Sequence, residues 1–413
     1  MATIFPFQPY RYSPKAGPLQ DLVTQPYDKI SPEMRQRYLQ ASPYNLVRVI
    51  LGDRHPSDSE SDNVYTRAAR YLDTWTAEGI LERDAEPGLF AYFQEFTVPD
   101  SGERLVRKAF IGLGAVEEYS AGVVYRHEQT LSGPKKDRLE LLRHTHAHFG
   151  QLFMLYPDPA GEIDRLLDQA AAAPPLGTVT DEYGARHSFW KISGAEAIAA
   201  IRQRMADKKL LIADGHHRYE TALAFHRENP TLPGADRVMM TFVNMHSPGL
   251  KILATHRLVS GIPNFDAGEF IRQAAAGFEV AQIPSLEAVQ RVWAESPDRA
   301  IIGAAIAARL YLIEARDSAG QLDVGVLHDR LLRGLLGIGE EAVREEKNLR
   351  YIRGLDAAVA EARSGAAQIA FLLKPVSVDA VARISFGGGV MPQKSTDFYP
   401  KLLSGLTIYK LES

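Results

Sequence analysis

The spacing of apolar positions differs from one part of the chain to another. This spacing predicts helices in some parts and strands in others. Residues 62–78 carry apolar side chains every three or four positions, which predicts an amphipathic helix with one apolar face: Val64, Ala68, Tyr71, Leu72 and Trp75. Another helix is predicted to begin at Pro32, with Ser31 as its N-cap. Residues 45–51 predict a strand, and the apolar run 300–315, interrupted by Arg309, predicts a buried strand.

Three parts of the chain follow from these patterns. Residues 1–120 form a predicted N-terminal α+β module, because strands at 88–98 and 103–119 surround a Pro-Asp-Ser-Gly turn. Residues 121–260 form a predicted core with helices at 161–173 and 194–206, and residues 261–413 a C-terminal α/β module. We therefore expect an α/β fold with mixed α+β sheets.

The stretch KLLIADGHHRYETALAFH reads as a strand, a tight turn and a helix. Residues 209–213 are the strand, Asp214 stands where an N-cap would, and Gly215 permits close backbone approach. Free N–H groups at a helix start favour anions, Arg218 suits phosphate oxygens, and His216 and His217 can exchange protons. These parts predict a phosphate-binding turn; the alternative is a capped helix with two histidines on an ordinary turn.

Composition narrows the classes of function. The 413 residues include no cysteine, which excludes disulfides, thiolate nucleophiles and thiolate metal sites. The net charge of −4 argues against a broad basic surface, so no nucleic-acid partner is expected. The chain begins without a secretory pattern and contains no apolar run long enough to span a bilayer, so we expect a cytoplasmic protein without membrane contact.

A family resemblance enters through several motifs. The chain resembles the bacterial family catalogued as domain of unknown function ten-fifteen, whose members are sometimes labelled ParB-like. The motifs that carry this resemblance are ADGHHRYETA, FPFQPYRY, VTQPYDKIS, HEQT with PKKDRLELL, and MPQKSTDFYPKLLSGL. DGHHR is also similar to the phosphate-binding turn of the ParB/sulfiredoxin superfamily, and QPYDKI resembles its upstream box. This implies a ParB/sulfiredoxin-like core with large inserted and C-terminal α/β modules. Asp28 and Asp214 are much farther apart than in a minimal core, so either a module is inserted or the upstream match is accidental.

The superfamily contains partition proteins, sulfiredoxins and free-serine kinases. Sulfiredoxin chemistry requires a cysteine, and the charge balance argues against a DNA-binding partition protein. The resemblance thus implies a kinase that transfers phosphoryl from ATP or ADP to a hydroxyl amino acid, with free L-serine giving O-phosphoserine as the leading reaction. A metal-dependent phosphatase or hydrolase, and a nucleotide-binding regulator without turnover, are the alternatives. The expected partners are the nucleotide and a small-molecule substrate, with a homodimer left open.

Roles follow for individual residues. Phosphate contacts are predicted for Asp214, Gly215, His216, His217, Arg218, Lys135, Arg138 and Lys394. Catalytic roles are predicted for Asp28, Glu128, His216 and His217, and substrate contacts for Arg48, His127, Glu220 and Asp397. Mg²⁺ would arrive with the nucleotide rather than occupy a preformed site, with Asp137 as a candidate ligand. Three alternatives remain: a salt bridge between Asp28 and Arg48, Asp137 as a helix N-cap, and zinc binding by His144, His146 and His148.

Overall fold

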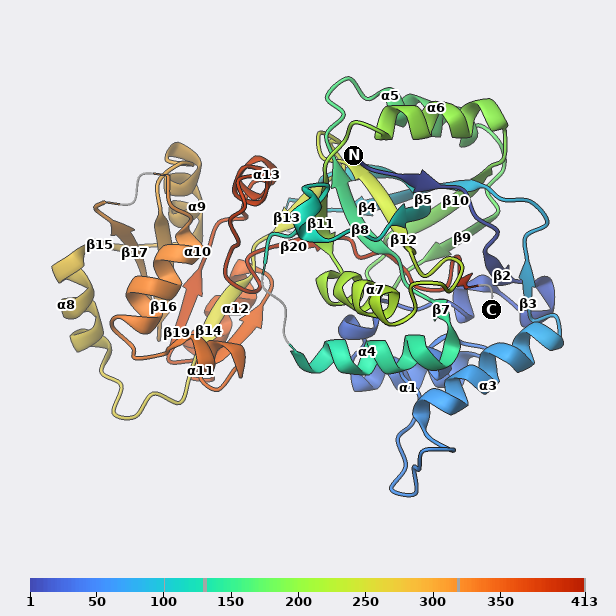
Figure 1. Ribbon diagram of the computed structural model, residues 1–413. Helices are drawn as coiled ribbons and strands as arrows, with labels where there is room; N and C mark the ends of the chain where they lie inside the picture. Colours follow the sequence, from blue (N-terminus) through green and yellow to red (C-terminus); the bar gives the residue numbers. More distant parts are fainter. Residues whose placement is uncertain (100, 129–131, 318–319, 412–413) are drawn as a thin grey trace. The chain divides into compact units, whose positions relative to one another are not determined.

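The computed structural model describes residues 1–99, 101–128, 132–317 and 320–411. The chain divides into two compact units, unit 1 with Met1–Lys251 and Pro400–Ser413, and unit 2 with Ile252–Tyr399 (Figure 1). This division differs from the three modules predicted from the sequence. Strands from 1–120 and from 121–260 pair within one sheet, and the end of the chain returns to the same unit.

Most strands of unit 1 form one mixed sheet. Among the described residues it has nine strands: β1 (Ile4–Phe5), β4 (Leu89–Thr97), β5 (Arg104–Ala115), β6 (Val124–Tyr125), β8 (Leu152–Tyr156), β9 (Gly177–Thr180), β10 (Arg186–Ile192), β11 (Leu210–Asp214) and β12 (Arg237–Asn244). Their order is β6-β11-β8-β12-β5-β4-β10-β9, and β1 pairs with β5. β12 runs parallel to β8, whereas β11 runs antiparallel to β8. The mixture of parallel and antiparallel pairs confirms the predicted α/β class with mixed sheets.

Helices and short strand pairs complete unit 1. The α-helices are α1 (Pro32–Ala41), α2 (Val47–Ile50), α3 (Val64–Ala77), α4 (Ser132–Thr145), α5 (Glu162–Ala170), α6 (Ala195–Met205) and α7 (His216–Glu228). Short 3-10 helices are η1 (Pro14–Ala16), η2 (Leu19–Asp21), η3 (Tyr27–Lys29) and η4 (Tyr119–Ala121). Two small pairs are β2 (Tyr10–Tyr12) with β3 (Leu81–Arg83), and β7 (Ala147–His148) with β21 (Tyr409–Lys410).

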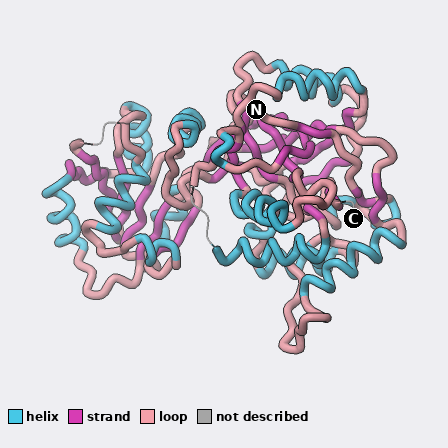
Figure 2. The backbone as a smooth tube through the Cα atoms, in the orientation of Figure 1, coloured by secondary structure: helices cyan, strands magenta, loops and turns pink. Residues whose placement is uncertain are grey.

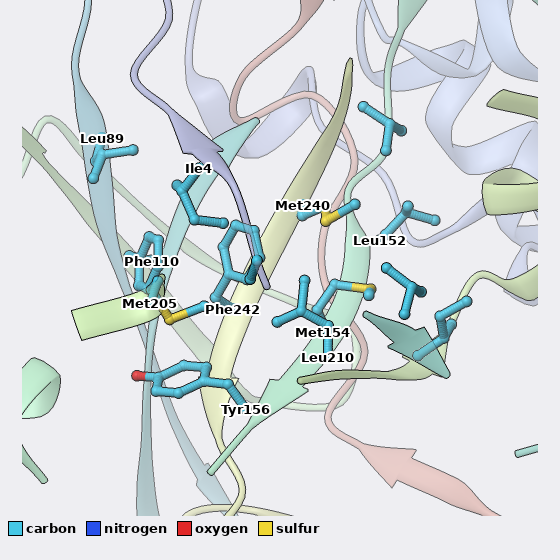
Figure 3. Close-up of a cluster of buried hydrophobic side chains, with 14 of the residues drawn as sticks. Ile4, Leu89, Phe110, Leu152, Met154, Tyr156, Met205, Leu210, Met240 and Phe242 are labelled. Carbon is cyan, nitrogen blue, oxygen red and sulfur yellow. The ribbon is translucent and has the colours of Figure 1, made fainter. Parts of the chain in front are cut away.

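One face of the large sheet holds the main apolar core of unit 1 (Figure 3). Leu152 and Met154 of β8 pack there with Met240 and Phe242 of β12. Side chains from α5, α6 and α7 join the same cluster, so these helices cover this face. Phe110 and Phe242 stack with ring centroids 4.8 Å apart. The sheet thereby fixes the start of α7, which follows β11 directly.

The opposite face of the sheet is partly polar. Cross-strand partners point to the same side of a sheet, and His187 lies opposite Gln94, which lies opposite Arg107. The returning C-terminal segment, residues 400–408, bonds to this row. The Gln94 amide donates to the carbonyl of Lys401 at 2.8 Å, and the Arg107 guanidinium donates to the carbonyl of Pro400. Several apolar side chains of the segment are buried: Leu402, Leu403, Leu406 and Ile408.

Local predictions for the N-terminal part are mostly confirmed. Ser31 accepts from the Met34 amide and Pro32 opens α1, as predicted. The predicted helix at 62–78 is α3, but its Tyr71 is exposed rather than part of the apolar face. The predicted strand at 45–51 is wrong. Its centre forms α2, because the Asn45 side chain accepts from the Val47 amide and starts a helical turn.

Unit 2 is built on a second, antiparallel sheet. Its six strands among the described residues are β14 (His256–Val259), β15 (Phe278–Ile283), β16 (Ile301–Ile306), β17 (Arg309–Ala315), β18 (Leu349–Ile352) and β19 (Ile369–Leu372), in the order β15-β17-β16-β19-β14-β18. The single strand predicted at 300–315 is wrong, because a tight turn at Ala307, with φ of 51°, folds it into the hairpin β16–β17. Short strands β13 (Lys251–Leu253) and β20 (Asp397–Tyr399) also pair.

Helices accompany the second sheet (Figure 2). They are α8 (Ala267–Gly277), α9 (Leu286–Glu295), α10 (Asp323–Val326), the π-helix η5 (Leu327–Arg333), α11 (Glu340–Arg344), α12 (Leu355–Arg363) and α13 (Val378–Phe386). Alternate side chains of β16 enter two apolar clusters, with Ile302 in one and Ile301 in the other. Both faces of this sheet are therefore covered. Within the described part of the chain, no helix is both long and apolar enough to cross a membrane.

Candidate functional site

The predicted strand, turn and helix are present as β11, Gly215 and α7. Gly215 has φ of 100°, a region that favours glycine. A Cβ atom at this position would lie 2.8 Å from Cδ2 of Leu152 and 3.0 Å from a terminal nitrogen of Arg218. Asp214 is the last residue of β11, and the N-cap is Gly215, without a side-chain cap. The prediction of Asp214 as the N-cap is therefore wrong, and its carboxylate serves other partners.

Basic side chains surround the Asp214 carboxylate. Nζ of Lys401 lies 2.9 Å from Oδ2, and a terminal nitrogen of Arg218 lies 3.5 Å from Oδ1. Burial opposes the charge of Asp214, but Lys401, Arg218 and Lys29 outweigh it and hold the pKa of this carboxyl well below its usual range. Asp214 is thus ionised near neutral pH. Three cations therefore act on the Asp214 carboxylate at the end of β11.

Arg218 is held by two groups of unit 1. One terminal nitrogen donates to the carbonyl of Gln151 at 2.5 Å, and the other faces Asp214. Its side chain is 16% exposed, so the charge is close to the surface but fixed in direction. Gln151 is buried and its side-chain oxygen accepts from Thr241. The predicted anion-binding arginine is therefore preorganised beside the first turn of α7.

Two of the predicted site histidines are buried and packed together. The rings of His127 and His216 meet edge to face with centroids 4.6 Å apart, and Nδ1 of His127 donates to the carbonyl of Ile212 at 2.7 Å. Burial lowers the pKa of His127 to about 4, and burial followed by the neighbouring His127 holds the pKa of His216 well below its ordinary value. Both rings are neutral near pH 7. His217 is half-buried, and its carbonyl accepts from Thr221 at 2.8 Å.

Helices α4 and α7 meet through a group of ion pairs. Glu220 lies 3.3 Å from Nζ of Lys135 and 3.7 Å from Arg126. The ion pair with Lys135 joins Glu220, a predicted substrate contact, to a predicted phosphate contact. Glu128, the other predicted acid in this region, is half-buried directly after His127. The rest of its HEQT motif, residues 129–130, lies outside the described residues.

Asp137 lies within α4, so its predicted position as an N-cap is wrong. Its carboxylate accepts from Tyr65 at 2.9 Å and from Arg54 at 2.6 Å, and it also contacts Arg138. Burial opposes its charge, but Arg138 and the hydrogen bonds keep the pKa of Asp137 below its ordinary value. These contacts make Asp137 part of an ion-pair network between α3 and α4.

The upstream QPYD box lies close to the turn despite the long separation in sequence. Lys29 is near enough to lower the pKa of Asp214. Tyr27 has a raised pKa because of burial and the nearby Asp28, and it also senses the charges of Arg218 and Asp214. Asp28 lies 3.9 Å from Lys29. The upstream box and the DGHHR turn therefore belong to one region of unit 1.

The alternative salt bridge between Asp28 and Arg48 is not formed among the described residues. Arg48 instead donates to the carbonyl of Leu39 at 2.8 Å. Its place on α2, rather than on the predicted strand, turns it toward α1. The structure thus brings Asp28 to the region of the turn and gives Arg48 a backbone partner elsewhere.

Two predicted site residues belong to unit 2. Asp397 is bound by Arg353, whose second contact is 2.8 Å long. Lys394 has φ of 57°, and its carbonyl accepts from Arg257 at 3.0 Å. These contacts organise the residues that lead into β20.

Lys401 belongs to the motif MPQKSTDFYPKLLSGL but was not predicted as a site residue. The side chain is 10% exposed and lies among buried leucines of the C-terminal segment. A lysine within such an apolar run is a usable signal, since buried lysines are rare unless paired. Its partner Asp214 could not be identified from spacing, because the contact depends on the fold of the whole unit.

A cavity of about 600 Å³, partly open to solvent, lies beside the turn. Arg218 and Thr221 of α7 line it together with Arg138 of α4 and Tyr27 of the upstream box. The Arg138 guanidinium stacks over the Tyr27 ring at 4.4 Å from its centroid. Across the described part of the chain, no group of three or more histidine or acidic side chains is placed to hold a metal ion, and this includes the three histidines considered for zinc.

No curated protein matches the chain in sequence. Similar solved structures include a free serine kinase in complex with AMP, 15% identical over 70% of this chain and 88% of that one, with a TM-score of 0.40. A conserved hypothetical protein from Pyrococcus furiosus is 17% identical over 67% and 87% of the two chains, with a TM-score of 0.36. SbnI with C-terminal truncation from Staphylococcus aureus is 10% identical over 72% and 87%, with a TM-score of 0.36. The pattern of the family described as protein of unknown function (DUF1015) matches residues 4–347, and the chain belongs to that family.

Proposed function

We propose that this protein is a small-molecule kinase that transfers the terminal phosphoryl group of ATP or ADP to a hydroxyl amino acid. Free L-serine, giving O-phosphoserine, is the acceptor we place first, following the resemblance of the DGHHR turn to the ParB/sulfiredoxin superfamily. A ParB/sulfiredoxin-like core is part of the same proposal.

One observation carries the proposal: the cluster of Lys401, Arg218 and Lys29 around Asp214 at the start of α7. Phosphoryl transfer needs fixed positive charge where the phosphate oxygens lie. The amides at the start of a helix and the adjacent cations supply it without reorganisation. Asp214 holds two of these cations in place, Lys401 and Arg218, beside the helix start that a polyphosphate would approach.

The reaction we propose is a direct displacement. The serine hydroxyl oxygen forms a bond to the terminal phosphorus while the bond from that phosphorus to the bridging oxygen breaks, releasing ADP or AMP. The hydroxyl proton passes to a carboxylate, for which Asp28 and Glu128 are the candidates. Mg²⁺ brought with the nucleotide would screen the phosphate charges.

The histidines divide between two roles in this proposal. His127 and His216 are buried and neutral near pH 7, so we assign them to the support of the turn. His217, which is half-buried on the first turn of α7, is the histidine we assign to the ligand. The roles predicted for Lys394, Asp397, Arg48 and Glu220 stay predictions.

The decisive experiment measures nucleotide binding and turnover in matched variants. Arg218→Ala removes a cation of the cluster, and Arg227→Ala is its control, because Arg227 lies later on α7 and pairs with Glu118 at the surface. Calorimetry with Mg²⁺ and ATP or ADP should show at least tenfold weaker binding for Arg218→Ala and unchanged binding for Arg227→Ala.

Turnover is read by phosphorus NMR after incubation with nucleotide and L-serine. Formation of O-phosphoserine with stoichiometric ADP or AMP would support the kinase. Equal nucleotide affinity in wild type and Arg218→Ala would contradict the proposed role of the turn in binding phosphate. Release of inorganic phosphate without an acceptor would instead indicate a hydrolase.

A further inference from the structure

The cavity beside the turn is enclosed by several segments of unit 1. Helix α7 contributes Arg218 and Thr221, helix α4 contributes Arg138 with two leucines, and residues 147–150 form another wall. The upstream box and Ser404 of the C-terminal segment complete the lining. About 600 Å³ of space, part of it open to solvent, lies within this lining.

The charged side chains that line this cavity are both cationic. Arg138 and Arg218 are its two charged lining residues, and both belong to described helices. The remaining walls are largely apolar, with aliphatic and aromatic side chains: Ile50, Leu141, Leu142, Phe149, Leu152 and Val238. No carboxylate occurs among the lining residues of the described chain. This lining suits a ligand that combines an anionic end with an uncharged body that tolerates apolar walls.

Flat and hydrogen-bonding surfaces are present as well. Tyr27 lies in the lining with the Arg138 guanidinium stacked on its ring, which makes a broad planar surface. His148 also lines the cavity and stacks on Tyr409 with an angle of 7° between the rings. Burial lowers the pKa of His148 to about 4, so near pH 7 its neutral ring offers one donor and one acceptor. Thr221 and Ser404 add hydroxyl groups.

We infer that this cavity binds the nucleoside, base and ribose together, of the nucleotide whose phosphates lie at residues 214–218. The inference rests on the proposed function, because it takes the phosphate position from it. Arg218 lies at the shared edge, contacting Asp214 on one side and lining the cavity on the other. A purine is flat and uncharged with donors and acceptors at its edge, which matches the planar and apolar walls.

Gly150, which lines the cavity, is closely packed against two other lining residues. A Cβ atom on Gly150 would lie 3.0 Å from Oγ of Ser404 and 3.3 Å from a terminal nitrogen of Arg218. A side chain at position 150 would therefore displace Ser404 or Arg218, which both line the cavity.

The test compares ATP with tripolyphosphate, which carries the phosphates without a nucleoside. Ala147 is buried and lines the cavity, so Ala147→Leu fills part of it. Calorimetry with Mg²⁺ should show at least tenfold weaker ATP binding and tripolyphosphate binding within twofold of wild type. Ala170→Leu, the same substitution on α5 at the main core, is the matched control and should bind both ligands as wild type does.

Photolabelling of the wild-type protein with 8-azido-ATP supplies a second measurement that needs no variant. The labelled peptides should contain residues 138–150, which form two walls of the cavity. Labels confined to residues 252–399 would overturn the inference. Equal losses of ATP and tripolyphosphate binding in Ala147→Leu would also overturn the inference. In that case both ligands still bind the wild type, and the proposed function stands. If wild type binds neither ligand, both proposals fail.

Discussion

The ammonium group of Lys401 lies 2.9 Å from the carboxylate of Asp214, although 187 positions separate the two residues in the sequence. The contact joins the last segment of unit 1 to the turn between β11 and α7. It also lies partly beyond the family match, which ends at residue 347. The C-terminal segment thus supplies a charged member of the candidate site as well as apolar side chains to the core.

Replacing this lysine by methionine should destabilise the protein. Lys401→Met keeps most of the apolar stem but leaves the Asp214 carboxylate with weaker compensation, at a cost of about 1–3 kcal/mol at pH 7. Because the pKa of Asp214 is lowered in the folded protein, its contribution is present above the ordinary aspartate pKa, near 4, and is lost as the pH falls further. Urea unfolding should therefore show a difference between wild type and variant that is largest near pH 7 and narrows below pH 4.

A double-mutant cycle separates the ion pair from general disruption. Asp214→Asn combined with Lys401→Met should recover part of the stability that Lys401→Met loses, since no buried carboxylate is left without its partner. Strictly additive losses would show that the two side chains do not stabilise each other.

Gly215 should tolerate no side chain. Gly215→Ala places a Cβ atom at positive φ and within 3.0 Å of both Leu152 and Arg218, so we expect a loss of about 1–3 kcal/mol from backbone strain alone. Nucleotide affinity should fall with it, because Arg218 must move. Gly184→Ala provides the comparison, since Gly184 also has positive φ but has no neighbouring atom within 4 Å of its Cβ position. If both variants lose the same stability and bind alike, the close contact at Gly215 is unimportant.

Local signals predicted much of the fold. The apolar run, the glycine and the following helix period predicted β11 and α7, because each is decided within a few neighbouring residues. The short run 45–51 was misassigned because it is apolar without a period, and the Asn45 cap that makes it helical acts over only two positions. The run 300–315 hid a turn, since Ala307 adopts a left-handed conformation without a glycine to signal it.

The site was predicted only where it is local. The turn residues Asp214 to Arg218 are neighbours in sequence and could be grouped by chemistry. The direction of each side chain could not be predicted from the sequence. His216 and His217 were therefore both expected at the ligand, whereas His216 packs against His127 in the interior. Lys401, Gln94 and Arg107 meet through sheet register and the returning C-terminal segment, which no short motif encodes.

The buried pair of histidines should make the protein sensitive to acid. His127 has a pKa of about 4 when folded, compared with an ordinary value near 6.5, so the unfolded chain takes up a proton first as the pH falls. Stability should therefore decline by roughly 3 kcal/mol from this group between pH 6.5 and pH 4. His127→Asn, whose amide nitrogen can take the place of Nδ1 and donate to the carbonyl of Ile212, should flatten this decline in urea unfolding at pH 7, 5.5 and 4.5. His55→Asn, in an exposed loop, should leave the decline as in wild type; a His127→Asn profile that follows the wild type would contradict the assignment.

Gln94 should position Lys401 through the protein backbone. Its amide group donates to the carbonyl of Lys401 at 2.8 Å, and its oxygen accepts from Nε of Arg107 at 2.9 Å. Gln94→Leu leaves both partners without this bond, at about 1–3 kcal/mol for each group.

Gln94→Glu is the sharper variant, because glutamate still accepts from Arg107 but cannot donate to Lys401. It should retain more stability than Gln94→Leu in urea unfolding and still bind nucleotide several-fold more weakly than wild type in calorimetry. Nucleotide binding equal to wild type in Gln94→Glu would mean that Lys401 reaches Asp214 without this support, and the role of Gln94 would then be confined to burying Arg107.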